Sequence, residues 1–213
     1  MGATISLIGI GLFAYLFGST PFGFLIGKFN GIDIRRVGSG NIGATNIRRA
    51  LGRDWGILCF ALDLLKGLLP VLICQTIAKN WSIGGETAGL IAALMTVTGH
   101  MWPCWLKFRG GKGVSTTIGT LFAIAPVAVL CALVVWLIVF LTARYVSLAS
   151  VCSAVTMPLA HAIHCPFRSR PILSPTLLLL AILATLIVAR HRGNLKRLLE
   201  GTEYRFGTKG KRS

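Results

Sequence analysis

The sequence predicts an all-α integral membrane protein with seven transmembrane helices, its N-terminus outside and its C-terminus in the cytoplasm. Of its 213 residues, 54% are hydrophobic and only 13% are charged, whereas soluble domains carry about 25% charged residues. The charge is also lopsided, because 22 Lys and Arg face 6 Asp and Glu, which gives a formal charge of +16. Disordered basic proteins lack such hydrophobic content, and soluble nucleic-acid binders lack this hydropathy. A membrane protein with basic residues beside the bilayer accounts for both observations.

Six apolar stretches supply the spans, since a helix needs about 20 apolar residues to cross a bilayer. They run over residues 4–27, 55–78, 87–101, 114–142, 146–163 and 172–189. So many spans leave no room for a separate soluble domain. We therefore expect one membrane-embedded catalytic domain over residues 1–213, with its chemistry in the loops and helix ends.

The basic loops orient the chain, because Lys-rich and Arg-rich loops stay in the cytoplasm. Loop 28–54, loop 102–113 and the tail from Arg190 are basic and should all lie inside. The chain must then cross an even number of times after the second of them, although three apolar stretches follow. Proline disfavours helix at the preceding residue, so we divide 114–142 at Ala125-Pro126 into helices at 114–125 and 127–142. One span there, and six in total, is the alternative.

Two further basic residues do not follow this orientation. Seven spans place Arg168 and Arg170 on the outer side, where the positive-inside rule disfavours them.

The first candidate site is a glycine-rich run in loop 28–54, which reads G-S-G-N-I-G-A-T-N-I-R-R from Gly38 to Arg49. Glycines let backbone N–H groups approach an anion, Ser, Asn and Thr add neutral hydrogen bonds, and Arg forks onto phosphate oxygens. A helix over 44–51 would direct its N-terminus at that anion. The alternative is a solvated turn beside orienting arginines, but the whole pattern favours an anion site. The candidate residues are Gly38, Ser39, Gly40, Asn41, Thr45, Asn46 and Arg49.

The second candidate site lies in loop 102–113, where F-R-G-G-K-G-V precedes an apolar helix. Flexible backbone, one Lys and a helix N-terminus together suit a phosphate group. His100, at the membrane end of this loop, either contacts substrate or is a hydrogen-bonded structural histidine. Trp102 and Trp105 are expected to be interfacial anchors. The candidate residues are His100, Gly110, Gly111, Lys112 and Gly113.

The third candidate site opens the tail, which reads R-H-R-G-N-L-K-R-L-L-E-G-T-E from Arg190 to Glu203. His191 and Asn194 are three residues apart, so on a helix they share a face. The alternative is a basic flank that stops membrane transfer. Residues 204–213 are expected to be a frayed basic end.

One charged pair falls inside a predicted span. Asp63 and Lys66 are three residues apart in the second apolar stretch. Charges within the bilayer are costly and usually paired, so we expect an ion pair near the cytoplasmic leaflet.

Together the three segments resemble the motifs of the bacterial acyl-phosphate:glycerol-3-phosphate acyltransferase family, the PlsY type. The resemblance runs from Ser19 to Glu203 and depends on the glycine-rich run at Gly38 combined with G-H…F-R-G-G-K-G-V from Gly99. It implies transfer of a fatty acyl group from acyl phosphate to the 1-hydroxyl of glycerol 3-phosphate. Lysophosphatidic acid and phosphate would result, at the first step of phospholipid synthesis.

The resemblance also implies a setting. The protein would lie in the bacterial inner membrane with its active site on the cytoplasmic side. Its partners would be glycerol 3-phosphate, acyl phosphate and membrane lipid. A monomer is expected, with no cofactor, metal or nucleic acid.

Residue roles follow from motif position. The catalytic residues would be Ser39, Arg49, Lys112, His191 and Asn194, with the other candidates binding substrate. Ser39, Arg49 and Lys112 would hold phosphates, and Asn194 would orient the nucleophile. The hydroxyl proton would go to His191 or to an oxygen of the donor phosphate, and Glu203 would be structural.

Another functional class is a transporter or channel for phosphorylated metabolites. Its signature would be polar or broken helices near the bilayer midplane, often in paired halves. Here the polar residues gather at one face and no internal repeat is detected, which favours the enzyme.

Overall fold

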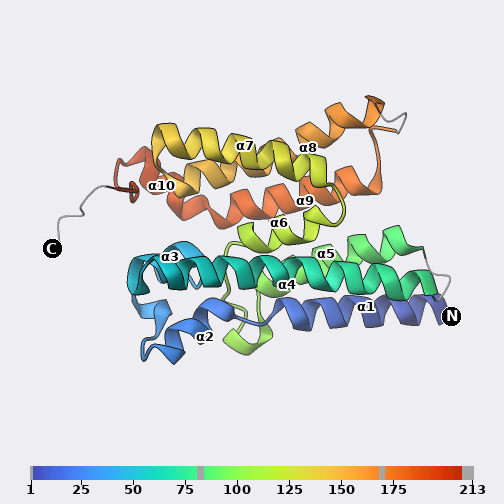
Figure 1. The fold of residues 1–213 in the computed structure, drawn as a ribbon, viewed down its shortest axis with the longest axis horizontal. Coiled ribbons are helices and arrows are strands. Elements are labelled where there is room, and N and C mark those ends of the chain that lie inside the picture. Colours follow the sequence, from blue (N-terminus) through green and yellow to red (C-terminus); the bar gives the residue numbers. More distant parts are fainter. Residues whose placement is uncertain (1, 81–83, 168–170, 208–213) are drawn as a thin grey trace. The chain divides into compact units, whose positions relative to one another are not determined.

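The computed structural model describes residues 2–80, 84–167 and 171–207, and all their regular elements are helical (Figure 1). The chain divides into two compact units, Met1–Pro126 (unit 1) and Val127–Ser213 (unit 2). Unit 1 contains α1 (Gly2–Gly18), α2 (Phe22–Phe29), η1 (Ile34–Arg36), α3 (Ala44–Leu51), α4 (Arg53–Asn80), α5 (Gly85–Met101), η2 (Cys104–Leu106) and α6 (Val114–Phe122). Unit 2 contains α7 (Pro126–Ala143), α8 (Val146–Phe167), α9 (Pro175–Arg190) and α10 (Arg192–Leu199).

Several helices suit a membrane by length and composition. Within the described residues, four stretches are long and apolar enough to cross one: Thr4–Phe29, Arg53–Lys79, Pro126–Ala143 and Val146–Phe167. The pair α9 and α10, bent by 54°, would make a fifth span. Helices α5 and α6 are shorter, with 17 and 9 residues. The all-helical class is confirmed, whereas seven spans stay a prediction.

Two local predictions are confirmed, and the first predicted span is interrupted. Helix α6 ends at Phe122 and α7 begins at Pro126, and α3 has the predicted bounds. However, residues 4–27 do not form one continuous helix, because the chain breaks between α1 and α2. Proline has no N–H with which Pro21 could continue α1. At the break, the backbone N–H and the hydroxyl of Ser19 both donate to the Tyr15 carbonyl, each at 2.8 Å.

The prediction of a frayed end from residue 204 is wrong in part. The Phe206 N–H donates to the Arg144 carbonyl at 2.8 Å, and its ring packs edge-on against Phe140 with centroids 5.2 Å apart. The tail is therefore fastened to α7 as far as Phe206. Residues 208–213, and the predicted outer pair Arg168 and Arg170, lie outside the described residues.

In unit 1, α5 packs against α1 and α4, and α4 packs against α6, as these helices run together in Figure 1. The contact between α4 and α6 is unusually close. A Cβ at Gly67 would overlap the Thr116 carbonyl oxygen, and one at Gly119 would overlap the Leu64 carbonyl oxygen. Because α6 begins directly after Gly113, this close packing also positions the second candidate loop.

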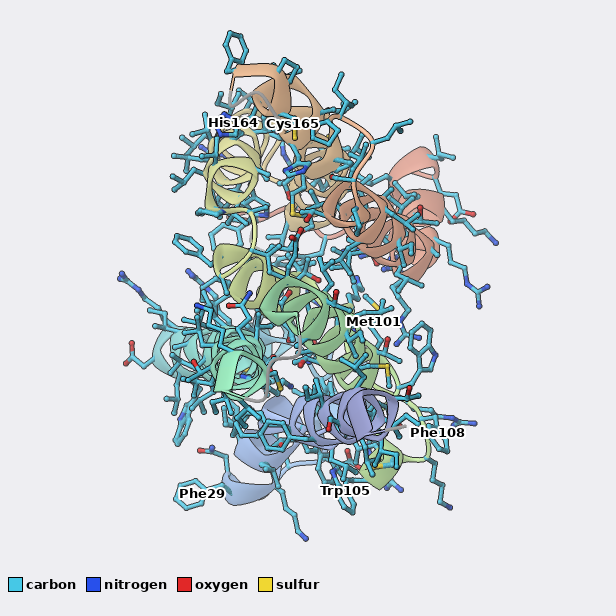
Figure 2. All side chains as sticks on the ribbon, turned by 90° about the vertical axis from the view of Figure 1, so that its right-hand side faces the viewer. Phe29, Met101, Trp105, Phe108, His164 and Cys165 are labelled. Atoms are coloured by element: carbon cyan, nitrogen blue, oxygen red, sulfur yellow. The ribbon has the colours of Figure 1, made fainter. Side chains whose placement is uncertain are left out.

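Apolar side chains cover much of the molecular surface. Leu65 on α4 and Leu137 on α7 are exposed, as expected of helices that face lipid. Figure 2 shows Phe29 and Trp105 projecting away from the helices of unit 1, and both are exposed. The exposure of Trp105 is consistent with its predicted role as an interfacial anchor.

Candidate functional site

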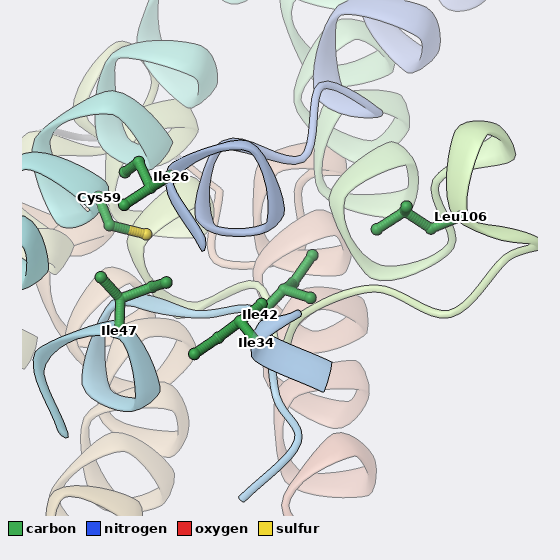
Figure 3. Packing of buried hydrophobic residues seen from close by; sticks show 6 residues of the cluster. All are labelled: Ile26, Ile34, Ile42, Ile47, Cys59 and Leu106. Carbon is green, nitrogen blue, oxygen red and sulfur yellow. The ribbon is translucent and has the colours of Figure 1, made fainter. Parts of the chain in front are cut away.

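The first glycine loop, residues 38–43, contributes Ile42 to a buried apolar cluster. Its members are Ile26, Ile34, Ile42, Ile47, Cys59 and Leu106 (Figure 3). They come from α2, η1, the loop itself, α3, α4 and η2. Leu106 belongs to the segment that leads into the second glycine loop, residues 110–113. One apolar cluster therefore supports both segments of unit 1.

Asn46 shapes the first glycine loop from within. Its side chain is buried, with only 2% of the residue exposed. The Oδ1 atom accepts the Ser39 N–H at 2.9 Å, while Nδ2 donates to the carbonyls of Val37 at 2.9 Å and Ile34 at 3.3 Å. These bonds connect η1 and the start of the loop to α3. Sequence reasoning placed Asn46 among substrate ligands, and the structure directs its amide to the loop backbone.

Asn41 has a comparable local task. Its Oδ1 accepts the Gly43 N–H at 2.8 Å, which turns the chain into α3, where Gly43 is the N-cap. Gly38 and Gly40 have φ of +59° and +69°, a left-handed region that favours glycine. A Cβ at Gly38 would also overlap Asn46 Oδ1. The glycines and the two amides thus set the loop conformation.

A surface ion pair supports the start of the same loop, and sequence reasoning missed it. Arg35 Nε and Nη2 donate to the two carboxylate oxygens of Asp33 at 2.9 and 2.8 Å. This forked hydrogen bond lowers the pKa of Asp33 to about 2. The Arg35 guanidinium also lies 4.7 Å from the Phe24 ring centroid. The i, i+2 spacing of Asp33 and Arg35 was the available signal.

The remaining first-loop candidates face outward. Ser39, Thr45 and Arg49 are exposed, in contrast with buried Asn46. Phosphate oxygens accept hydrogen bonds from donors of this kind: two hydroxyls, a guanidinium and the first N–H groups of α3. The loop therefore has the composition and the accessibility of an anion site.

The second glycine loop folds back on the end of α5. The Gly111 N–H donates to the His100 carbonyl and the Gly110 N–H to the Met101 carbonyl, both at 3.1 Å. Gly113, with φ of +83°, is the N-cap of α6, and Lys112 before it is half-buried. Lys112 is thus placed just before the N-terminus of a helix, where an anion is favoured.

The predicted ion pair of Asp63 and Lys66 is confirmed, while its place near the cytoplasmic leaflet stays a prediction. Lys66 Nζ lies 2.9 Å from Asp63 Oδ1, and the two side chains are only 1% and 3% exposed. Lys66 Nζ also lies 3.0 Å from His100 Nδ1. His100 is therefore engaged through Nδ1 by a residue 34 positions away, a contact with no signal in the sequence.

The tail candidates lie in unit 2. His191, 3% exposed, is the junction between α9 and α10, so it does not share one continuous helix with Asn194 as predicted. Its Nδ1 lies 2.8 Å from the Ile187 carbonyl oxygen. A carbonyl only accepts, so Nδ1 donates and the neutral ring carries its lone pair on Nε2.

Glu203 organises the tail around Asn194. Its Oε1 accepts from Asn194 Nδ2 at 2.6 Å and from Ser147 Oγ at 2.8 Å, and Oε2 accepts from Arg197 Nε at 2.8 Å. Partial burial raises the pKa of this carboxyl, but the hydrogen bonds from Asn194, Ser147 and Arg197 outweigh burial and hold it below its usual value. This geometry supports the structural role expected for Glu203.

No three His, Cys, Asp or Glu side chains gather to hold a metal ion within residues 2–80, 84–167 and 171–207.

Comparison with known proteins places the chain among close relatives. A sequence model of the glycerol-3-phosphate acyltransferase family matches residues 8–201. The glycerol-3-phosphate acyltransferase of Aquifex aeolicus is 44% identical over 195 residues, 92% of this chain and 96% of the relative. That of Trichlorobacter lovleyi is 45% identical, over 91% of this chain and 94% of the relative.

Two solved structures are similar as well. Both are crystal structures of PlsY (YgiH), an integral membrane glycerol 3-phosphate acyltransferase. The glycerol 3-phosphate form has a TM-score of 0.83 and 43% sequence identity. The lysophosphatidic acid form has a TM-score of 0.81 and 42% identity. Each comparison covers 95% of this chain and 96% of the other.

Proposed function

Because the chain belongs to the glycerol-3-phosphate acyltransferase family, we propose that it transfers a fatty acyl group from acyl phosphate to the 1-hydroxyl of glycerol 3-phosphate. The protein is an acyltransferase of phospholipid biosynthesis and an integral membrane protein. The acyltransferase assignment argues against the alternative of a transporter. The products would be lysophosphatidic acid and inorganic phosphate.

The observation that carries the residue assignments is the pair of glycine loops in unit 1, supported by one apolar cluster. Each loop precedes a helix that starts at a glycine N-cap, Gly43 or Gly113. Ser39 and Arg49 would bind one phosphate group, with Thr45 as a neighbouring donor. Lys112 would supply the cation at the second loop. Asn41 and Asn46 would act by shaping the first loop, in place of direct substrate binding.

The donor chemistry suits such a site. An acyl phosphate is a mixed anhydride, so phosphate leaves readily once the acyl carbon is attacked. Positioned donors and cations can then supply much of the rate by holding both substrates and the developing negative charge. Ser39, Arg49 and Lys112 are the groups proposed to do so.

The hydroxyl of glycerol 3-phosphate loses a proton as it attacks. The Nδ1 hydrogen bond of His191 to the Ile187 carbonyl supports Nε2 as the proton acceptor,. An oxygen of the donor phosphate is the other candidate. Asn194, held by Glu203, would orient the nucleophile. Replacing His191 with Gln distinguishes the two. If His191 is the base, wild-type activity should fall as pH falls, whereas the activity of His191→Gln should be low and independent of pH. If the donor phosphate is the base, the two pH profiles should have the same shape.

Seven spans, an outer N-terminus and a cytoplasmic site form the proposed topology, in a bacterial inner membrane and as a monomer. In a cysteine-free background, Glu86→Cys should react with an impermeant maleimide in intact cells. Lys107→Cys and Tyr145→Cys should react only after the cells are opened. Labelling of Tyr145→Cys in intact cells would instead favour one span over residues 114–142.

Donor choice tests the proposed reaction. Purified protein is incubated with glycerol 3-phosphate and either palmitoyl phosphate or palmitoyl-CoA, and both phosphate and lysophosphatidate are measured. Equal amounts of the two products, formed only from palmitoyl phosphate, are expected. Acyl transfer from palmitoyl-CoA alone would contradict the proposed donor.

A further inference from the structure

The buried ion pair of α4 has no part in the proposed chemistry, although it is costly to maintain. Asp63 and Lys66 lie within a candidate membrane span, and their side chains are 3% and 1% exposed. Charges in such surroundings are retained only with close partners and usually serve a function. The partners of Lys66 indicate what that function is.

Lys66 places its ammonium group among three acceptors. Nζ lies 2.9 Å from Asp63 Oδ1, 2.8 Å from the Thr20 carbonyl oxygen and 3.0 Å from His100 Nδ1. An ammonium has three N–H donors and no acceptor: its hydrogen bonds go to Thr20 and His100, and the contact with Asp63 is an ion pair. Thr20 lies in the break between α1 and α2. Lys66 thereby connects α4 to that break and to the end of α5.

This arrangement determines the tautomer of His100. Since the ammonium can only donate, Nδ1 must be the accepting nitrogen, and the ring proton lies on Nε2. Asp63 Oδ1 is 3.7 Å from Nδ1, which is too long for a hydrogen bond that would reverse the assignment. The neutral Nε2–H form of His100 follows.

The opposite edge of the same ring meets the second glycine loop. A Cβ at Gly111 would overlap the imidazole, with Nε2 as the nearest atom. The His100 carbonyl also accepts the Gly111 N–H. Ring orientation and loop position are therefore coupled directly, one residue before Lys112.

We propose that Asp63 and Lys66 are positioning residues for the second glycine loop: Lys66 holds His100 as its Nε2–H tautomer against Gly111, and Asp63 holds Lys66. Nε2 then presents an N–H, and no lone pair, to a loop that receives an anion. This inference deepens the proposed function, because it assumes that Gly110–Gly113 binds a substrate phosphate. A role limited to joining α4 to the α1–α2 break is the competing explanation.

The tautomer can be measured without any activity assay, so the result is independent of the proposed reaction. Nitrogen NMR of [15N]His-labelled protein in lipid is recorded for wild type and for His100→Asn, and the signals lost in the variant assign His100. A protonated Nε2 and an unprotonated Nδ1 are expected, with Nδ1 shifted in Lys66→Met. A protonated Nδ1 in wild-type His100 would overturn the proposal.

A double-mutant cycle tests the route of action. Lys66→Met and His100→Asn should each lower kcat/KM by about tenfold. The kcat/KM of the double variant should be no more than about twofold below that of the less active single variant, because both substitutions remove the same interaction. The competing explanation predicts that the two losses multiply, which would refute coupling through His100. Lys79→Met, on the exposed end of the same helix, is the matched control and should keep wild-type activity.

Asp63→Asn extends the cycle and replaces Lys66→Met if that variant cannot be purified folded. It removes the counter-ion but leaves Lys66 its contacts to Thr20 and His100. Asp63→Asn alone is expected to lower kcat/KM by less than tenfold. Added to His100→Asn, it is expected to cause no further loss. Full loss in both backgrounds would contradict a role through His100.

Discussion

The first glycine loop of unit 1 and the tail of unit 2 each organise candidate site residues around one side chain. That side chain is neutral in the loop and charged in the tail. In the loop, the neutral amide of buried Asn46 connects Ser39 to Val37 and Ile34. In the tail, the carboxylate of Glu203 collects Asn194, Ser147 and Arg197. An amide both donates and accepts and has no charge to titrate, whereas a carboxylate only accepts and loses its charge in acid. The loop should therefore depend on geometry, and the tail on pH.

Removing the amide should break the loop and give the largest effect. Asn46→Ala leaves the Ser39 N–H and two carbonyls without their partner, which should cost about 3 kcal/mol of stability and lower activity about a hundredfold. Thermal unfolding and lysophosphatidate formation measure the two losses. Asn30→Ala is the control. It removes one hydrogen bond from a side-chain amide to the Ile26 carbonyl, outside the loop, and should change activity little.

Filling space at the second glycine loop tests whether it too depends on geometry. Gly111→Ala would drive a methyl group into the His100 ring, and displacement of the loop should lower kcat/KM by about fiftyfold. Gly9→Ala has open space around it and should be neutral or slightly stabilising. Activity of Gly111→Ala near that of Gly9→Ala would show that the contact is not needed.

Removing one side chain that binds phosphate should lower activity less than these changes do, because the loop conformation survives. Ser39→Ala and Lys112→Ala are each expected to lower turnover by at least about tenfold while the protein still inserts and unfolds normally. Turnover with saturating substrates, together with the elution profile in detergent, separates the two properties. Near wild-type turnover of either variant would remove that residue from the site.

Acid should affect the tail and give the smallest effect. Glu203 has a folded pKa below its ordinary value of 4.5, so its charge stabilises the fold above that value and this contribution is lost as pH falls through the folded pKa. Wild type should exceed Glu203→Gln in Tm by about 3 °C at neutral pH. The difference should disappear below the folded pKa. A constant difference across the acid range would contradict the charge-based account of the tail.

The sequence by itself determined the features that depend on local composition. Hydropathy located the helices, because burial in lipid requires apolar residues along a whole span. Pro126 located the start of α7. The glycine, hydroxyl and basic pattern from Gly38 identified the loop and the α3 helix. The i, i+3 spacing of Asp63 and Lys66 was sufficient to predict their ion pair.

Only the tertiary structure decided which side chains serve the substrate and which serve the fold. Asn46 and Arg49 both lie on α3 within one motif, yet Asn46 is buried against the loop and Arg49 is exposed. Lys66 meets Thr20 and His100, which are 46 and 34 residues away, and Phe206 packs on α7 in a segment expected to fray. The break at Ser19–Pro21 was hidden because hydropathy averages over it. Each of these depends on hydrogen bonds or packing between segments distant in the chain, and composition and periodicity carry no record of such partners.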